Sequence, residues 1–248
     1  MTAFEIGVDI LTDALGPVSA LVDECKLRFD DDGLSITAVD PANVAMVDMT
    51  INRGAFDGFE SDDRVLGVNL ERLEDVLSMA DSGDVVKVSL DQETRKLDID
   101  IGGLSYTLAL IDPDSIRQEP DIPDLDLPAT VVVEGRQISR GVSAADLCSD
   151  HITLQAAADE ETFYINAEGD TDDVSLALGD DDLLSANVSE SCESMFSLDY
   201  LSDMERAMPS DGEISLRLGT EVPVKMRYSL ADGSVEVVNM LAPRISSE

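Results

Sequence analysis

The sequence has no tryptophan, a single histidine and three cysteines, and only 4% of its 248 residues are aromatic. The cysteines, Cys25, Cys148 and Cys192, are dispersed without a CxxC pair, which favours reduced thiols in a cytosol over a disulfide framework. With no second histidine and no thiol pair, His151 does not complete a zinc site. The spacing of Cys148 and His151 also fits a nucleophile and its base, but an ordinary helix-to-strand junction accounts for it as well. We therefore predict no metal site.

The sequence also lacks long hydrophobic runs and catalytic motifs. No apolar run approaches the roughly 18 residues of a membrane span, and the N-terminal residues MTAFEIGVDILTDA lack the basic start of a signal peptide. A glycine-rich phosphate loop, a GxSxG elbow and an HExxH motif are all absent. We therefore expect a cytoplasmic protein without membrane association, cofactors or catalytic residues.

Basic residues are scarce in the sequence. Lysine and arginine together number 16 against 53 aspartates and glutamates, and the formal net charge is −37. This self-repulsion disfavours a compact state in dilute buffer, but at molar salt the screening length falls to about 3 Å and the repulsion largely disappears. The 44% of hydrophobic residues argues against global disorder. The composition therefore indicates a halophilic protein, and the triplets Asp30–Asp32 and Asp180–Asp182 are interpreted as solvated surface rather than cation sites.

Two segments of the chain repeat one pattern. VNLERLEDVLSMADSGDVVKVSL begins at Val68 and FSLDYLSDMERAMPSDGEISLRL begins at Phe196, and each predicts an amphipathic helix, a turn and an alternating strand. The two segments have the same order of elements, and another amphipathic helix precedes each of them in its half of the chain. These similarities favour an internal duplication over chance. The proline- and aspartate-rich residues 112–128, DPDSIRQEPDIPDLDLP, then connect two copies of one fold, with domains at 1–111 and 129–248.

Strands outnumber helices in each half of the chain. Helices are expected at 10–24, 69–80, 136–150 and 198–208. Strands are expected at 26–29, 34–39, 44–51, 85–90, 97–101 and 106–111, and then at 131–133, 152–156, 163–165, 174–178, 214–218, 222–229 and 235–241. Many short strands with two helices on one face are typical of antiparallel sheets. We therefore predict an α+β fold of two topologically similar domains, each with antiparallel sheets and two helices.

Five segments together resemble a known family. They are AVDPANVAMVDMTI at 38–51, GVNLERLEDVL at 67–77, the proline-bearing connector, Val222-Pro223, and LAPRI at 241–245. In this order they resemble the sliding clamps of the proliferating cell nuclear antigen family, of the archaeal type and from a halophilic archaeon. Two alternatives are a clamp paralogue that assembles into a mixed ring, and a halophilic enzyme on a two-domain β-rich scaffold.

The resemblance implies an assembly and a set of partners. Three subunits would close head-to-tail into a homotrimeric ring around double-stranded DNA, with the helices lining the hole and the sheets outside. The ring would be opened by a clamp loader ATPase and would tether DNA polymerase, flap nuclease and ligase through short hydrophobic-aromatic motifs. It would have no catalytic activity of its own.

The resemblance also places a client pocket between the connector and the C-terminal segment. The matching positions are Val39, Asn43, Val44, Met46, Pro120, Ile122, Pro123, Leu125, Pro223, Met240, Ala242 and Pro243. An apolar patch on so acidic a surface fits a recognition site. Met240 stands where relatives often carry an aromatic residue, and the connector is about two residues longer than in better-known relatives.

Subunit contacts would join two edge strands, because an exposed edge strand has unpaired backbone N–H and C=O groups that can bind a second strand. The matching segments are 104–111 of one chain and 172–178 of the next, with Leu104, Tyr106, Leu108, Leu110, Val174, Leu176 and Leu178 as the contact residues.

The DNA-facing helices depart from the family, whose members carry many basic residues there. The four expected helices hold only four arginines against eleven acidic residues, and the arginines are Arg72, Arg136, Arg140 and Arg206. Phosphate neutralisation holds DNA poorly at molar salt. A closed ring needs no such affinity, because it stays on DNA by topology.

Overall fold

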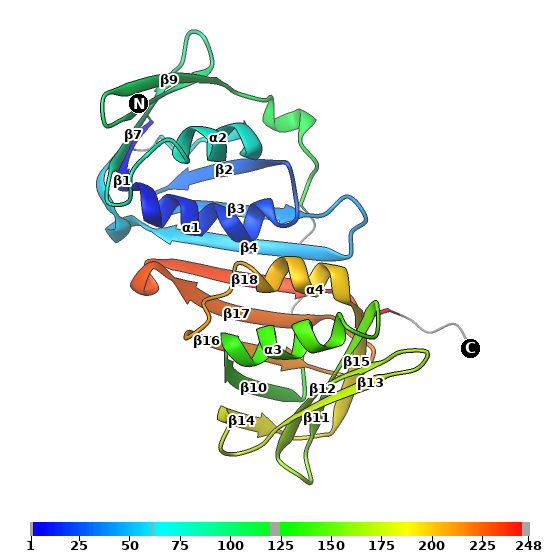
Figure 1. Ribbon diagram of the computed structural model, residues 1–248. Coiled ribbons are helices and arrows are strands. Elements are labelled where there is room, and N and C mark those ends of the chain that lie inside the picture. The colour runs from blue at the N-terminus through cyan, green and yellow to red at the C-terminus, as the bar shows by residue number, and fades with distance from the viewer. Residues whose placement is uncertain (1, 61, 120–124, 245–248) are drawn as a thin grey trace. The chain divides into compact units, whose positions relative to one another are not determined.

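The computed structural model describes residues 2–60, 62–119 and 125–244, and shows four α-helices among many short strands (Figure 1). The chain divides into two compact units. The first comprises Met1–Pro120 and Ser229–Val237, and the second comprises Asp121–Tyr228 and Val238–Glu248. Each unit combines two helices with antiparallel strands. The predicted α+β class is therefore confirmed.

The first unit begins with a strand, a helix and five strands, and continues with a second helix and three strands. Its elements are β1 (Ala3–Gly7), α1 (Val8–Ser19), β2 (Glu24–Asp30), β3 (Gly33–Val39), β4 (Ala45–Asn52), β5 (Phe56–Glu60), β6 (Val65–Asn69), α2 (Leu70–Leu77), β7 (Val85–Asp91), β8 (Lys96–Ile101) and β9 (Leu104–Ala109). One antiparallel sheet has the order β5-β1-β7-β8-β9, and β4-β3-β2-β6 pair antiparallel in a second. Helices α1 and α2 contact each other and cover this second group of strands.

The elements from β10 to β18, of which the segment Ser229–Val237 is grouped with the first unit, repeat that order. They are β10 (Ala129–Glu134), α3 (Gly135–Ala145), β11 (His151–Ala157), β12 (Thr162–Glu168), β13 (Asp173–Leu178), β14 (Leu183–Val188), β15 (Cys192–Ser197), α4 (Leu198–Glu205), β16 (Glu213–Leu218), β17 (Val224–Leu230) and β18 (Val235–Leu241). The sheet order β14-β10-β16-β17 corresponds to β5-β1-β7-β8, and β13-β12-β11-β15 corresponds to β4-β3-β2-β6. Helix α3 packs on α4. The two units therefore share one topology, as the sequence repeat predicts.

Local sequence explains why these elements form. In β8, Leu97, Ile99 and Ile101 are buried while the residues between them are exposed, which is the two-residue period of a half-buried strand. In α2, the Asn69 side chain caps the helix by accepting a hydrogen bond from the backbone N–H of Arg72 at 2.9 Å. Its apolar residues recur at helical spacing and are buried, and full burial of each leucine contributes about 1.5–3 kcal/mol.

The structure differs from the sequence-based expectation at element ends. All four helices end earlier than expected, at Ser19, Leu77, Ala145 and Glu205, because the apolar period continues into the turns that follow. The strands β1, β5, β6, β14 and β15 were not expected. Three of them, β1, β6 and β15, lead directly into helices, and even the glycine that ends β1, Gly7, is the N-cap of α1, so no separate turn marks where these strands end.

Candidate functional site

The four arginines predicted to face DNA lie on or beside helices α2, α3 and α4 and are all exposed. Arg136 pairs with Glu134 and, at 3.5 Å, with Asp211. Arg206 pairs with Asp203 at 2.8 Å. Both cations therefore already have acidic partners within their own unit.

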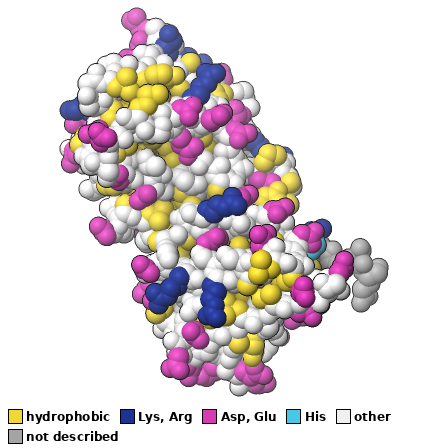
Figure 2. Space-filling model, in the orientation of Figure 1, with side chains coloured by type: hydrophobic (Ala, Val, Ile, Leu, Met, Phe, Trp, Pro, Cys, Tyr) yellow, Lys and Arg dark blue, Asp and Glu magenta, His cyan; other side chains and the backbone are white. Residues whose placement is uncertain are grey.

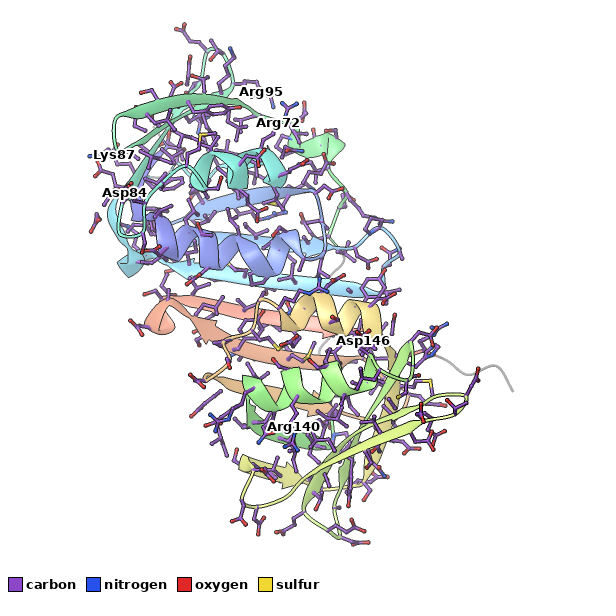
Figure 3. The ribbon with its side chains drawn as sticks, viewed as in Figure 1. Arg72, Asp84, Lys87, Arg95, Arg140 and Asp146 are labelled. Carbon is purple, nitrogen blue, oxygen red and sulfur yellow. The ribbon has the colours of Figure 1, made fainter. Side chains whose placement is uncertain are left out.

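Arg72 on α2 and Arg140 on α3 differ from this pair (Figure 3). Within the described ranges, neither of them forms an ion pair. Each unit thus presents one arginine on its helices that remains available to an outside anion.

Acidic groups outnumber these arginines on the helical side. In Figure 2 the lysine and arginine side chains lie singly among more numerous acidic side chains. Helix α1 contains no basic residue, and desolvation and the neighbouring charge of Asp9 raise the pKa of its Asp13. The helices therefore do not form a basic surface of the kind that holds phosphates by charge.

Each unit ends one of its sheets in a strand that is paired on one side. Strand β9 is the last strand of the sheet β5-β1-β7-β8-β9, and β13 is the last of β13-β12-β11-β15. On β9, the side chains of Leu104 and Tyr106 are 39% and 38% exposed. Val174 and Leu176 on β13 are half-buried. Both segments predicted to join subunits are thus sheet edges.

Two residues of the predicted subunit contact have another role within their own unit. Leu108 and Leu178 are almost completely buried, so their side chains belong to their own cores and only their backbones lie at an edge. Leu110, after β9, is half-buried. The sequence did not predict that Leu147, just after the end of α3, is 83% exposed. Its position continues the apolar period of the helix, so it was expected to be part of that helix.

The predicted client residues of the first unit lie in the β3–β4 hairpin, with Asn43 and Val44 in its loop. Val39 and Met46 face each other across the strand pair and are buried, whereas Val44 is half-buried and Asn43 is exposed. Asn43 has a φ of 59°, in the left-handed region that asparagine tolerates best among non-glycine residues. The loop therefore presents Asn43 and Val44 outward.

The buried carboxylate of Asp40 shapes this loop by accepting hydrogen bonds from the backbone N–H groups of Ala42, Val44 and Ala45 at 2.6–2.8 Å. We expect Asp40→Ala to lower the free energy of unfolding by about 3 kcal/mol, because three backbone donors, one buried and two partly buried, lose a charged acceptor. Asp30 is the matched control, since it accepts from two backbone N–H groups in an exposed turn. Asp30→Ala should cost under about 1 kcal/mol. Denaturant unfolding in molar KCl measures both, and equal losses would contradict this role of Asp40.

The predicted client residues of the second unit lie near its C-terminal segment. Pro223, Ala242 and Pro243 are half-buried and Met240 is buried. The backbone N–H of Arg244 donates to the carbonyl of Met195 on β15 at 2.7 Å, which holds the segment after β18 in place.

The connector enters the second unit at Leu125, which is half-buried and whose carbonyl accepts a hydrogen bond from Arg217 at 3.4 Å. Pro120, Ile122 and Pro123, which sequence reasoning also assigned to the client pocket, lie outside the described residues.

Metal ligands and membrane-spanning helices are the remaining features to place in the described part of the chain. No group of three or more His, Cys, Asp or Glu side chains there is arranged to hold a metal ion. His151 pairs with the adjacent Asp150, and the Cys148 thiol donates to the carbonyls of Ala145 and Ala167. None of the helices described is both long and apolar enough to cross a membrane.

Known proteins share both the sequence and the fold. Residues 6–103 match the proliferating cell nuclear antigen N-terminal domain, and residues 121–244 match its C-terminal domain. DNA polymerase sliding clamps of the halophilic archaea Natronomonas pharaonis and Haloarcula marismortui are 57% and 56% identical over 243 residues, which is 98% of each chain. The structure of A. fulgidus PCNA bound to the C-terminal region of FEN-1 covers all of both chains at 34% identity, with a TM-score of 0.93. The chain therefore belongs to the proliferating cell nuclear antigen family of sliding clamps.

Proposed function

We propose that three copies of this chain close head-to-tail into a ring that encircles duplex DNA. This proposal rests on two different exposed sheet edges, β9 in one unit and β13 in the other. A contact between non-identical surfaces generates a ring when its rotation closes, and each exposed edge supplies backbone groups for pairing. The family consists of processivity factors without catalytic activity, which fits a role as a mobile tether.

The mass of the assembled protein tests the ring. We expect light scattering of the chain expressed alone to give a trimer in molar KCl, because screening removes the repulsion of −37 charges per subunit while apolar contacts persist. At low salt the same protein should dissociate. A monomer at every salt and protein concentration would contradict the homotrimer, and a trimer that appears only after other clamp chains are added would indicate a mixed ring.

Topology rather than charge would keep this ring on DNA. Two of the four helix arginines are already paired with acidic groups of their own unit. Phosphate binding also weakens steeply as salt rises. The free protein should therefore have negligible affinity for short linear duplexes, although a loaded ring would remain on a circle.

Client proteins would bind through short hydrophobic-aromatic motifs. A. fulgidus PCNA, 34% identical to this chain, is bound to the C-terminal region of FEN-1 in its structure. By extension, the clients here would include a DNA polymerase, a flap nuclease and a ligase, and a loader ATPase would open the ring in the cytoplasm. We propose that both the loop at Asn43–Met46 and the segment at Met240–Pro243 contribute to client binding.

We expect Val44→Asp to weaken binding of a motif peptide about thirtyfold, because a carboxylate in an apolar contact costs about 2 kcal/mol or more. Val44 is preferred to Met46, which is buried and whose replacement would damage the fold. Val65→Asp is the matched control, since Val65 is an exposed valine on β6. Fluorescence anisotropy in molar KCl measures the affinity, and removal of residues 242–248 should weaken it as well. Equal affinities for the wild type and all three variants would place the client site elsewhere.

A further inference from the structure

The first part of the connector is fastened to its own unit. We call residues 112–119 the connector arm. Just before it, the backbone N–H of Ile111 donates to the carbonyl of Gly67 at 2.8 Å. Ile116 is buried, and a Cβ at Gly67 would come within 2.8 Å of its Cδ1 atom and 2.6 Å of the Ile111 carbonyl oxygen. Glycine at position 67 therefore permits the close approach of the arm to β6.

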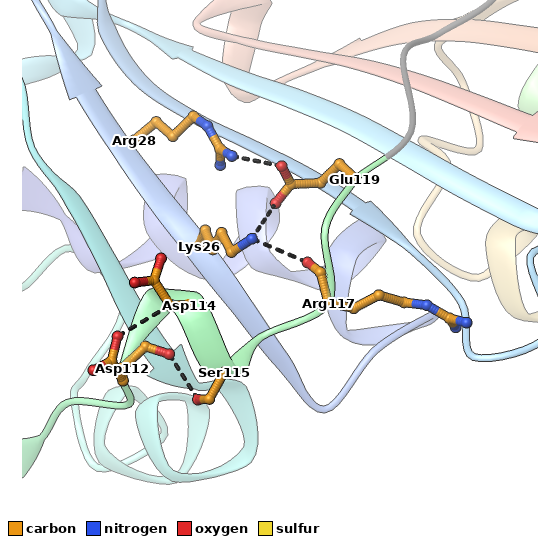
Figure 4. A network of polar contacts seen from close by, with 7 residues as sticks. All are labelled: Lys26, Arg28, Asp112, Asp114, Ser115, Arg117 and Glu119. Carbon is orange, nitrogen blue, oxygen red and sulfur yellow. Dashed lines mark hydrogen bonds and ion pairs between the residues drawn. The ribbon is translucent and has the colours of Figure 1, made fainter.

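Two cations of β2 hold the far end of the connector arm (Figure 4). One carboxylate oxygen of Glu119 lies 3.6 Å from Lys26 Nζ, and the other accepts a hydrogen bond from Arg28 Nη2 at 2.5 Å. Lys26 Nζ also donates to the carbonyl of Arg117 at 3.1 Å. The side chains of Lys26 and Glu119 are only 9% and 15% exposed. Salt screens partly buried pairs much less than exposed ones, so this contact can persist in a high-salt cytosol.

The connector arm also reaches the loop that presents the client residues. Arg117 Nη1 donates to the backbone carbonyl of Asp40 at 3.0 Å. The carboxylate of Asp40 in turn accepts from the backbone of Val44 and Ala45. A continuous set of contacts thus runs from Glu119 through Arg117 to the loop between β3 and β4.

A cavity of about 310 Å³ lies between the connector arm and the unit. Its lining includes Cys25, Val39, Ile116 and Glu119. Cys25 is buried, and this burial, followed by the negative charges of Glu119 and Glu74, raises the pKa of its thiol to about 12. The thiol is thus unreactive while the arm is in place, because only an accessible thiolate reacts quickly.

We propose that Glu119 is a positioning residue for client binding. Its pairs with Lys26 and Arg28 fix the connector arm on β2, and the arm fixes the loop at Asn43–Met46 through Arg117. The inference rests on the proposed client binding. In this proposal Lys26 and Arg28, two of the few basic residues of the chain, bind the connector rather than DNA.

Three variants test this role in the full-length protein: Glu119→Gln, Lys26→Gln, and the control Glu93→Gln. Glu93 is exposed in the turn after β7, so its replacement changes the net charge as Glu119→Gln does. In molar KCl, Glu119→Gln and Lys26→Gln should each weaken binding of a hydrophobic-aromatic motif peptide about tenfold. Glu93→Gln should leave it unchanged.

Labelling of Cys25 by an uncharged maleimide, located by peptide mass mapping, gives the second readout. Glu119 is one of the charges that raise the thiol pKa and Lys26 is not among the groups that shift it, so charge alone would speed labelling in Glu119→Gln only. A released connector arm should speed labelling about tenfold or more in both variants. The trimer mass should be the same in every variant.

The outcomes separate this inference from the proposed function. If the wild type binds no motif peptide, client binding itself is wrong and the inference fails with it. If the wild type binds and Glu119→Gln alters neither affinity nor Cys25 labelling, the positioning role alone is wrong. Weaker binding without faster labelling would mean that Glu119 contacts the client directly, and faster labelling without weaker binding would mean that the arm does not position the client site. Either result overturns the proposal.

Discussion

Replacing Leu104 and Tyr106 together with glutamate should convert the proposed trimer into monomers in molar KCl. Both side chains are more than a third exposed on the edge strand β9, so they contribute little to the core of their own unit. Buried against a neighbouring subunit, the two would contribute about 4 kcal/mol. Losing this contribution raises the dissociation constant about a thousandfold.

Light scattering at micromolar protein measures the assembly state of this variant, and far-ultraviolet circular dichroism reports whether it is folded. The matched control is Leu184→Glu, because Leu184 is 49% exposed on β14, which is also the end strand of a sheet. The control should remain a trimer. A folded double variant that is still a trimer would show that β9 is not the subunit contact.

Replacing all four helix arginines with serine should slow loading onto nicked circular DNA about tenfold and leave retention at molar salt unchanged. Opening and threading require transient contact with phosphates, which cations favour, whereas a closed ring needs no attraction to stay on a circle. The four residues are Arg72, Arg136, Arg140 and Arg206.

Ion pairing within the units divides these four arginines into two matched pairs. Arg72 and Arg140 form no ion pair among the described residues, and Arg136 and Arg206 are paired with neighbouring acids. The Arg72→Ser/Arg140→Ser variant should therefore load as slowly as the quadruple variant. The Arg136→Ser/Arg206→Ser variant should load nearly as the wild type does. Loss of retention in any of them would mean that charge holds the protein on DNA.

The sequence allowed much of the fold to be predicted, because apolar periodicity is a local signal. The helices around Leu73 and Leu201 and the alternating strand at 97–101 follow directly from such periods. The strands β1, β6 and β15 are short and run directly into helices, so their alternating pattern is not separated from the helical period that follows; β10 also runs into a helix, but its run of three valines marks it as a strand. The spacing of apolar residues indicates which face of an element is buried, whereas turn residues indicate where the element ends.

The candidate site was less predictable, because its contacts join residues far apart in the sequence. Leu104 and Leu108 lie on the same face of β9, so the exposure of one and the burial of the other depend on how far along the strand that face is covered, which the apolar pattern alone does not show. The pairing of Glu119 with Lys26 and Arg28 likewise links a connector to a strand about ninety residues earlier. In a chain with 53 acidic residues, no local pattern indicates which acid meets a cation.

Linearisation of DNA carrying the loaded protein tests the central claim most directly. The protein is loaded onto nicked circular plasmid by a clamp loader ATPase, washed in molar KCl, and the plasmid is then cut once. A ring held by topology slides off the new ends, so the account predicts full retention before the cut and release after it. Protein that remains bound to the linear DNA, or that is never retained on the circle by a competent loader, would contradict the sliding-ring account.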